Sequence, residues 1–125
     1  MNAKKVLIID DEAHMRRVTE LSLRKGDFQL VFGADGDEAV TLALAEHPDL
    51  IVLDVLMPKV DGFTALKEIK QNPATAAIPV IMLTSRGHHM TRQEAEDCGA
   101  SLFLTKPFSP TQLLAEVRRL LSESP

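Results

Sequence analysis

Five short runs of β-branched and leucine residues alternate with longer segments along this chain. The first, third and fourth runs show no apolar–polar alternation, which is typical of strands covered on both faces of a sheet. The second run includes Gln29 and fits an edge strand. The runs are Val6–Ile9, Phe28–Phe32, Leu50–Leu53, Ile78–Leu83 and Leu102–Leu104. Regular alternation of strand and helix predicts a doubly wound α/β fold, with a parallel sheet and helices on both faces.

The segments between and after these runs are long enough for helices. In the first segment two apolar stripes compete, and periodicity does not rank them: Met15 with Val18, and Leu21 with Leu23. The predicted helices are Glu12–Lys25, Asp37–His47, Gly62–Gln71, Thr91–Cys98 and a last one starting at Ser109-Pro110. The stretch between Asn72 and Ala77 is expected to be an exposed loop.

Residues typical of helix ends support these boundaries. Asp35 and Glu38 have the spacing of a capping pair before the second helix. Gly99 is a natural stop after the fourth. Ser109 followed by Pro110 places a cap residue before proline at the first helical position.

Length and composition indicate how many domains the chain forms and which partners its charge disfavours. The 125 residues are expected to form one domain, residues 1–125. With 14 basic and 18 acidic residues the net charge is −4, which argues against direct binding of nucleic acid or an anionic membrane surface. The uninterrupted apolar runs are far shorter than a membrane span of about twenty residues. Cys98 is the single cysteine, so no internal disulfide is possible, and we expect a cytoplasmic protein.

Polar residues stand where the predicted strands end. Asp10 and Asp11 follow the first strand, and Asp54 follows the third. Thr84 ends the fourth strand, and Lys106 ends the fifth. In a doubly wound sheet, ligands bind outside the carboxyl ends of the strands. If the first and third strands are neighbours, three carboxylates converge there with one lysine and one hydroxyl.

Such a cluster would attract a divalent cation. Three carboxylates and one ammonium leave a net charge of −2. Like charges at one site repel unless a cation offsets them. All-oxygen ligands point to Mg²⁺, or Mn²⁺, rather than zinc. The histidines show no ligand spacing with Cys98 and are interpreted as solvated surface residues: His14, His47, His88 and His89.

Each acid also has a simpler explanation. Asp11 could cap the first helix, and Asp10 could be solvated. Asp54 closes an apolar run and is followed by three more apolar residues, so no solvated loop accounts for it. One shared site explains all the strand ends together better than four separate coincidences do.

The strand ends belong to longer motifs: Asp10-Asp11, Asp54…Met57-Pro58…Asp61-Gly62, Thr84-Ser85 and Thr105-Lys106-Pro107-Phe108. With these motifs the chain resembles the receiver domain of two-component response regulators. The resemblance covers essentially the whole chain and implies a five-stranded flavodoxin-like sheet with strand order 2-1-3-4-5.

The resemblance implies a phosphoacceptor and a metal site. Asp54 would take a phosphoryl group from a sensor histidine kinase or a histidine phosphotransfer protein. Asp11 and Asp54, with the backbone carbonyl of Leu56, would hold Mg²⁺, and Asp10 would reach the ion directly or through water. The domain would be a signalling module rather than an enzyme, although it would assist its own phosphorylation and dephosphorylation.

The resemblance also implies a switch. Lys106 would pair with one phosphoryl oxygen, and Thr84 would hydrogen-bond another. Phe103 matches the switch aromatic, and its movement would remodel the face formed by the fourth helix, fifth strand and fifth helix. The peptide between Lys106 and Pro107 would be cis, as X–Pro bonds permit.

Two positions depart from the commonest family pattern or vary freely in the family, and they bear on the lifetime of the phosphorylated state. Leu56 and Arg86 flank the route that water would take to the phosphoryl group. Leucine cannot orient a water molecule, and Arg86 could cover the site.

Three other functions fit the sequence less well. A haloacid-dehalogenase-type phosphatase needs a second Asp two residues after the nucleophile, where this chain has Leu56. A flavin or dinucleotide site is disfavoured, because acids follow the first strand and no G-x-G-x-x-G motif does. A degenerate receiver used only for docking is disfavoured, because all five site residues are present.

The partners are expected to be a kinase and a downstream protein target or fused output domain. The kinase would dock on the exposed side of the first helix, at His14, Met15 and Val18, and near Pro107-Phe108. Met15 and Val18 could equally be core residues. Only four residues follow Leu121, which fits a stand-alone receiver or the receiver part of a longer chain.

Overall fold

The computed structural model describes residues 3–55, 62–85, 97–106 and 108–123. Their strands form one parallel five-stranded sheet with the order β2-β1-β3-β4-β5, as the sequence resemblance implied. The strands are β1 (Lys4–Ile9), β2 (Phe28–Gly33), β3 (Leu50–Asp54), β4 (Val80–Ser85) and β5 (Leu102–Lys106). The run containing Gln29 is an edge strand, as predicted.

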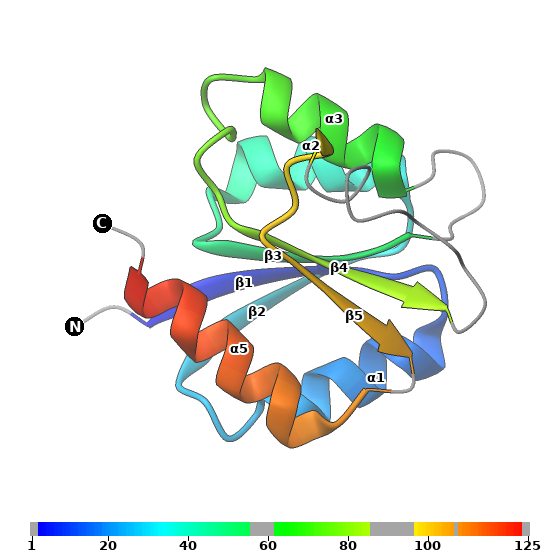
Figure 1. Ribbon diagram of the computed structural model, residues 1–125, viewed down its shortest axis with the longest axis vertical. Helices are drawn as coiled ribbons and strands as arrows, with labels where there is room; N and C mark the ends of the chain where they lie inside the picture. Colours follow the sequence, from blue (N-terminus) through cyan, green and yellow to red (C-terminus); the bar gives the residue numbers. More distant parts are fainter. Residues whose placement is uncertain (1–2, 56–61, 86–96, 107, 124–125) are drawn as a thin grey trace.

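Helices cover both faces of this sheet (Figure 1). They are α1 (Ala13–Leu23), α2 (Gly36–Glu46), α3 (Gly62–Gln71) and α5 (Pro110–Glu123). Helices α2 and α3 lie on one face, and α1 and α5 lie on the other. Of the predicted helix Thr91–Cys98, only Asp97 and Cys98 fall within the described residues. None of the helices described is long and apolar enough to cross a membrane.

Two apolar layers hold the helices to the sheet. Residues that alternate along β1, β3 and β4 point into one layer or the other, so these strands are buried on both faces. This explains why their sequences show no polar alternation. The layer under α1 and α5 includes Ile8, Val52 and Leu83, and the layer under α2 and α3 includes Leu7, Leu53 and Met82.

The fourth predicted strand began two residues too early. Strand β4 starts at Val80, and Ile78 and Pro79 precede it. The N–H of Ile78 closes a turn onto the carbonyl of Thr75 at 3.1 Å. Proline has no N–H to donate to a neighbouring strand. The preceding loop is also not wholly exposed, since the Thr75 side chain is buried and donates to the carbonyl of Ile69 at 2.6 Å.

Neither of the two apolar stripes that competed in the sequence forms the inward face of helix α1 by itself. In the second stripe Leu23 is buried but Leu21 is exposed, and in the first Met15 and Val18 are half-buried. The other buried residues of the helix, Thr19 and Ser22, are polar. Periodicity left the choice open, and the inward face includes two hydroxyl residues that an apolar stripe does not mark. Ser22 donates to the carbonyl of Val18, which satisfies its hydroxyl group within the helix.

The predicted helix ends are present. The Asp35 side chain accepts from the N–H of Glu38 at 3.2 Å, and the Glu38 carboxylate accepts from the N–H of Ala34 at 3.1 Å. Gly99 has a φ of +86°, a left-handed conformation that favours glycine. The N–H of Gln112 donates to the Ser109 hydroxyl at 3.3 Å. Local sequence signals therefore set these boundaries correctly.

Candidate functional site

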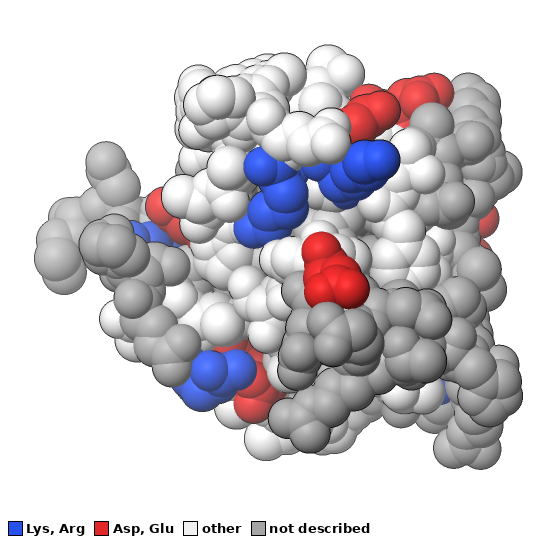
Figure 2. Space-filling view, turned by 45° about the horizontal axis from the view of Figure 1, so that its top comes forward, with Lys and Arg blue, Asp and Glu red and all other residues white. Residues whose placement is uncertain are grey.

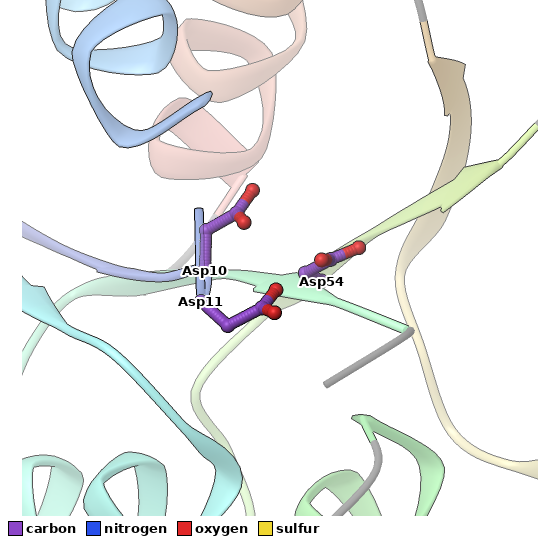
Figure 3. Close-up of side chains that lie close together, drawn as sticks. All are labelled: Asp10, Asp11 and Asp54. Atoms are coloured by element: carbon purple, nitrogen blue, oxygen red, sulfur yellow. The ribbon is translucent and has the colours of Figure 1, made fainter. Parts of the chain in front are cut away.

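The carboxyl edge of the sheet gathers three aspartates from two neighbouring strands. Asp10 directly follows β1, Asp11 comes next, and Asp54 is the last residue of β3. Ile9 pairs with Leu53, so the two strand ends lie at the same level. One carboxylate oxygen from each aspartate lies within 4.8 Å of the others. Figure 3 shows the Asp11 carboxylate turned toward Asp54.

Burial differs among the three acids. Asp10 and Asp54 are 0% and 3% exposed, whereas Asp11 is open to solvent. Buried carboxylates require partners, because an isolated buried charge is very costly. The open side at Asp11 leaves access for a ligand.

Lys106 supplies the charge partner from the end of β5. Its Nζ lies 3.1 Å from Asp10 Oδ2 and 3.2 Å from Asp54 Oδ1, so one ammonium bridges both buried carboxylates. Burial alone would lower the pKa of Lys106, but the two carboxylates outweigh it and raise this pKa above its ordinary value. Lys106 is therefore a firmly charged group in this site.

Asp10 is held through its backbone as well as its side chain. Its N–H donates to the carbonyl of Gly33 on β2 at 3.2 Å. Its Oδ1 accepts from the N–H of Glu12 at 3.0 Å, and its carbonyl accepts from Nη1 of Arg16 at 2.6 Å. The simpler explanations for the acids are thus wrong. Asp10 is not solvated, and the N-cap residue of α1 is Glu12 rather than Asp11.

Gly62 brings the start of α3 against the backbone of Asp54. Its N–H donates to the carbonyl of Val55 at 2.8 Å. A Cβ at Gly62 would lie 2.7 Å from Val55 Cα and closer still to the Asp54 carbonyl oxygen. Glycine is required here because the backbones approach so closely. In the sequence, Gly62 is visible only as part of the Asp61-Gly62 motif, and nothing there signals this close approach.

Thr84 and Phe103 lie on the α3 side of the sheet. Thr84 is buried, and its hydroxyl donates to the carbonyl of Leu104 at 3.4 Å. Phe103 pairs with Met82 on β4, two residues before Thr84. Its ring is partly buried against Phe63 of α3, with centroids 6.4 Å apart. Thr84 and Phe103 are therefore near neighbours on the adjacent strands β4 and β5.

Several residues named from the sequence lie outside the described part of the chain. Among the rest, His14 and His47 are exposed, as expected, and Cys98 is partly buried. In the described ranges, the three aspartates form the only group of acidic, histidine or cysteine side chains with metal-ligand spacing. The residues discussed from the sequence that the structure does not describe are Leu56, Met57, Pro58, Asp61, Arg86, His88, His89 and Pro107.

Fold and site together define a flavodoxin-like α/β domain with an acidic, lysine-bridged site at its carboxyl edge. The family model of the response regulator receiver domain matches residues 6–118. The chain therefore belongs to the response regulator receiver domain family. Receiver domains are signalling domains of two-component systems, not conventional enzymes.

Curated relatives extend well beyond this chain. "Probable transcriptional regulator ycf27" of Cyanophora paradoxa is 43% identical over 97% of this chain and 49% of its own length. "DNA-binding dual master transcriptional regulator RpaA" of Synechocystis is 39% identical over 94% of this chain and 48% of its own length. The chain thus spans about half the length of the curated relatives it matches.

Solved structures agree with the fold. The response regulator domain of Thermotoga maritima CheB has a TM-score of 0.84 at 34% identity, covering 99% of this chain and all of that one. The receiver domain of the sensor histidine kinase PA1611 from Pseudomonas aeruginosa has a TM-score of 0.88 at 27% identity, covering 98% and 100%. That structure is described as having a magnesium ion coordinated in its active site cleft.

The donor set of this chain fits such an ion. All three candidate ligands are carboxylates, which are hard oxygen donors of the kind that Mg²⁺ prefers. Lys106 already engages one oxygen of Asp10 and one of Asp54, while Asp11 faces solvent. Mg²⁺ usually keeps several water ligands and takes only one or two carboxylates, and the solvent-exposed side at Asp11 leaves room for those water molecules.

Proposed function

We propose that this domain accepts a phosphoryl group on Asp54 from a phosphohistidine and thereby acts as a switch in two-component signalling. The observation that carries the proposal is the bridge of Lys106 between two buried carboxylates beside the exposed Asp11. Asp54 is the acid that ends β3, and its carboxylate lies within 4.8 Å of those of Asp10 and Asp11 and pairs with Lys106. The whole chain, residues 1–125, is proposed to serve as one receiver domain.

The proposed reaction is a phosphoryl transfer. A carboxylate oxygen of Asp54 attacks the phosphorus atom, an O–P bond forms, and the P–N bond to the donor imidazole breaks. The electron pair of that bond returns to the imidazole nitrogen. Catalysis of such a transfer rests on positioning and on stabilising charge.

Each residue of the site has a task in that step. Asp11 and Asp54, with the backbone carbonyl of Leu56, are proposed to hold Mg²⁺, and Asp10 is proposed to reach it directly or through water. The ion would neutralise charge on the phosphoryl oxygens. Lys106 pairs with Asp54 and is placed to pair with a phosphoryl oxygen. Its raised pKa means that it keeps its proton at neutral pH.

The switch is proposed to run from Thr84 to Phe103. In the structure the Thr84 hydroxyl donates to the carbonyl of Leu104. Redirecting that donor to a phosphoryl oxygen would free a backbone acceptor on β5 beside Phe103. The Phe103 ring would then repack from Phe63 into the space that Thr84 leaves, as a population shift between two packings.

Partners follow from the family and the relatives. A sensor histidine kinase or phosphotransfer protein is proposed as the donor. The receiver would control a protein target or a fused output domain, since the relatives include DNA-binding regulators twice as long. On the face in Figure 2, basic side chains form only small groups with acidic ones beside them. The whole chain also carries a net charge of −4, so we assign any DNA contact to an output domain rather than to this one.

Phosphorylation of Asp54 is tested with a small-molecule donor. Acetyl phosphate and Mg²⁺ should add one alkali-labile phosphoryl group per chain, detected by intact mass. Asp54→Ala should abolish the addition, whereas Asp37→Asn on the exposed part of α2 should leave it unchanged. Full modification of Asp54→Ala would refute the assignment.

The switch is tested separately with beryllofluoride, which mimics the phosphoryl group. Thr84→Ala should still accept a phosphoryl group, because Asp54 and Lys106 are untouched. Amide chemical shifts near Phe103 should respond to beryllofluoride in the wild type and much less in Thr84→Ala. A full response in the variant would exclude Thr84 as the link.

A further inference from the structure

We infer that Arg16 is a positioning residue for the Asp10–Asp11 segment, and thus sets the Mg²⁺ affinity of the site. The inference rests on the proposed function and assigns a role to a residue outside the acidic cluster. Arg16 lies in the first turn of α1 and is half-buried. Its Nη1 donates to the carbonyl oxygen of Asp10 at 2.6 Å, a short, charge-assisted hydrogen bond.

That carbonyl belongs to the peptide joining Asp10 to Asp11. Because a peptide is planar, holding its C=O also holds the direction of the next N–H and the position of the Asp11 Cα. The other polar groups of Asp10 are already fixed by Gly33, Glu12 and Lys106. The remaining polar group of Asp10 is its carbonyl, which leads into Asp11, and Arg16 is the residue that holds it.

Asp11 depends on this backbone restraint. Its side chain is exposed, and no residue in the described ranges donates a hydrogen bond to its carboxylate. The Glu12 side chain makes no capping hydrogen bond at the start of α1. Two other side chains hold this turn: Asp10 Oδ1 accepts from the N–H of Glu12, and Arg16 donates to the Asp10 carbonyl. The main chain therefore sets the direction of the Asp11 Cα–Cβ bond, and Arg16 is the side chain from α1 that restrains it.

If Arg16 acted only through its charge, removing it would change the Mg²⁺ affinity in the opposite direction from removing a positioning hydrogen bond. A nearby guanidinium repels a divalent cation, so removing it would tighten Mg²⁺ binding if charge were all that mattered. Removing a positioning hydrogen bond weakens binding instead. The sign of the change in affinity therefore separates the two roles.

The neighbouring arginine offers a matched control. Arg17 is exposed and pairs on the same helix with Glu20 at 2.9 Å. Arg16→Met and Arg17→Met remove the same charge from adjacent positions and preserve helix propensity. Only the first removes a hydrogen bond to the Asp10 carbonyl.

Calorimetric titration with Mg²⁺ measures the effect on affinity. Arg16→Met should raise the Kd about tenfold, the lower end of the loss seen when a hydrogen bond behind a metal ligand is removed. Arg17→Met should match the wild type. With acetyl phosphate, Arg16→Met should need more Mg²⁺ for half-maximal phosphorylation but should approach the wild-type rate at saturation.

A metal-free measurement tests the hydrogen bond itself. Without Mg²⁺, the carbonyl ¹³C resonance of Asp10 and the amide ¹⁵N resonance of Asp11 should shift in Arg16→Met and not in Arg17→Met. If Arg16→Met does not fold, Arg16→Gln replaces it, with a weaker loss of affinity expected in the same direction.

An unchanged or tighter Kd in the Arg16 variant, an equal loss in Arg17→Met, or an unmoved Asp10 resonance would each overturn the inference. Failure of the proposed function looks different. In that case the wild-type protein itself would take up neither Mg²⁺ nor a phosphoryl group on Asp54.

Discussion

Replacing Lys106 with methionine should destabilise the Mg²⁺-free protein much more than an ordinary lost ion pair. The variant keeps most of the side-chain length but leaves Asp10 and Asp54 without their shared cation. The carboxylate side chains of these acids are only 1% and 4% exposed. Breaking a buried pair by removing one partner costs about 3–5 kcal/mol, because the other charge is left unpaired. We expect about 3 kcal/mol, since solvent reaches the cluster through Asp11.

Lys5 supplies the matched control. Its Nζ lies 3.1 Å from Glu46 Oε1, the same distance as in the Lys106–Asp10 pair, but the two side chains are 24% and 36% exposed. Partly exposed pairs of this kind are worth about 0–1 kcal/mol. Loss of this ion pair in Lys5→Met should therefore lower the free energy of unfolding by no more than about 1 kcal/mol. The variant also loses the hydrogen bond from Lys5 Nζ to the Glu46 carbonyl.

Urea unfolding followed by circular dichroism measures both variants. The chain has no tryptophan or tyrosine, so intrinsic fluorescence is a poor probe. Saturating Mg²⁺ should restore part of the stability of Lys106→Met, because a ligand that binds only the folded state stabilises it. A loss no larger than that of Lys5→Met would refute the argument from burial.

Three further predictions follow from single features of the structure. Gly62→Ala should destabilise by about 1–2 kcal/mol in urea unfolding, because overpacking against Asp54 and Val55 outweighs the gain in helix propensity; equal or higher stability would contradict the close approach. Thr19→Val should raise the urea midpoint by the equivalent of about 1 kcal/mol, because the buried Thr19 hydroxyl has no hydrogen-bond partner among the described residues; a clear loss would reveal a partner. The stability that Lys106 contributes should be fully present below its ordinary pKa of 10.5 and should be lost as pH rises through its raised folded-state pKa. The difference in unfolding free energy between wild type and Lys106→Met should therefore shrink in strongly alkaline solution.

Much of the fold could be predicted because its signals are local. Apolar runs without alternation identified the strands buried on both faces, and Gln29 marked the edge strand. Caps at Asp35 and Ser109 marked where helices begin. The inward face of α1 was not predictable in this way, because Thr19 and Ser22 are buried by neighbouring elements rather than by their own apolar character.

By itself, the sequence determined which residues end each strand, and hence that acids and a lysine would meet at one edge. Parallel strands share their carboxyl edge whatever their exact contacts, so this much followed from order along the chain. Only the tertiary structure decided the pairing: Lys106 bridges Asp10, 96 positions away, and Asp54. It also decided that Arg16 clamps the Asp10 carbonyl and that Gly62 abuts the Asp54 backbone. These contacts depend on strand register and on how closely helices approach the sheet, which local periodicity does not encode.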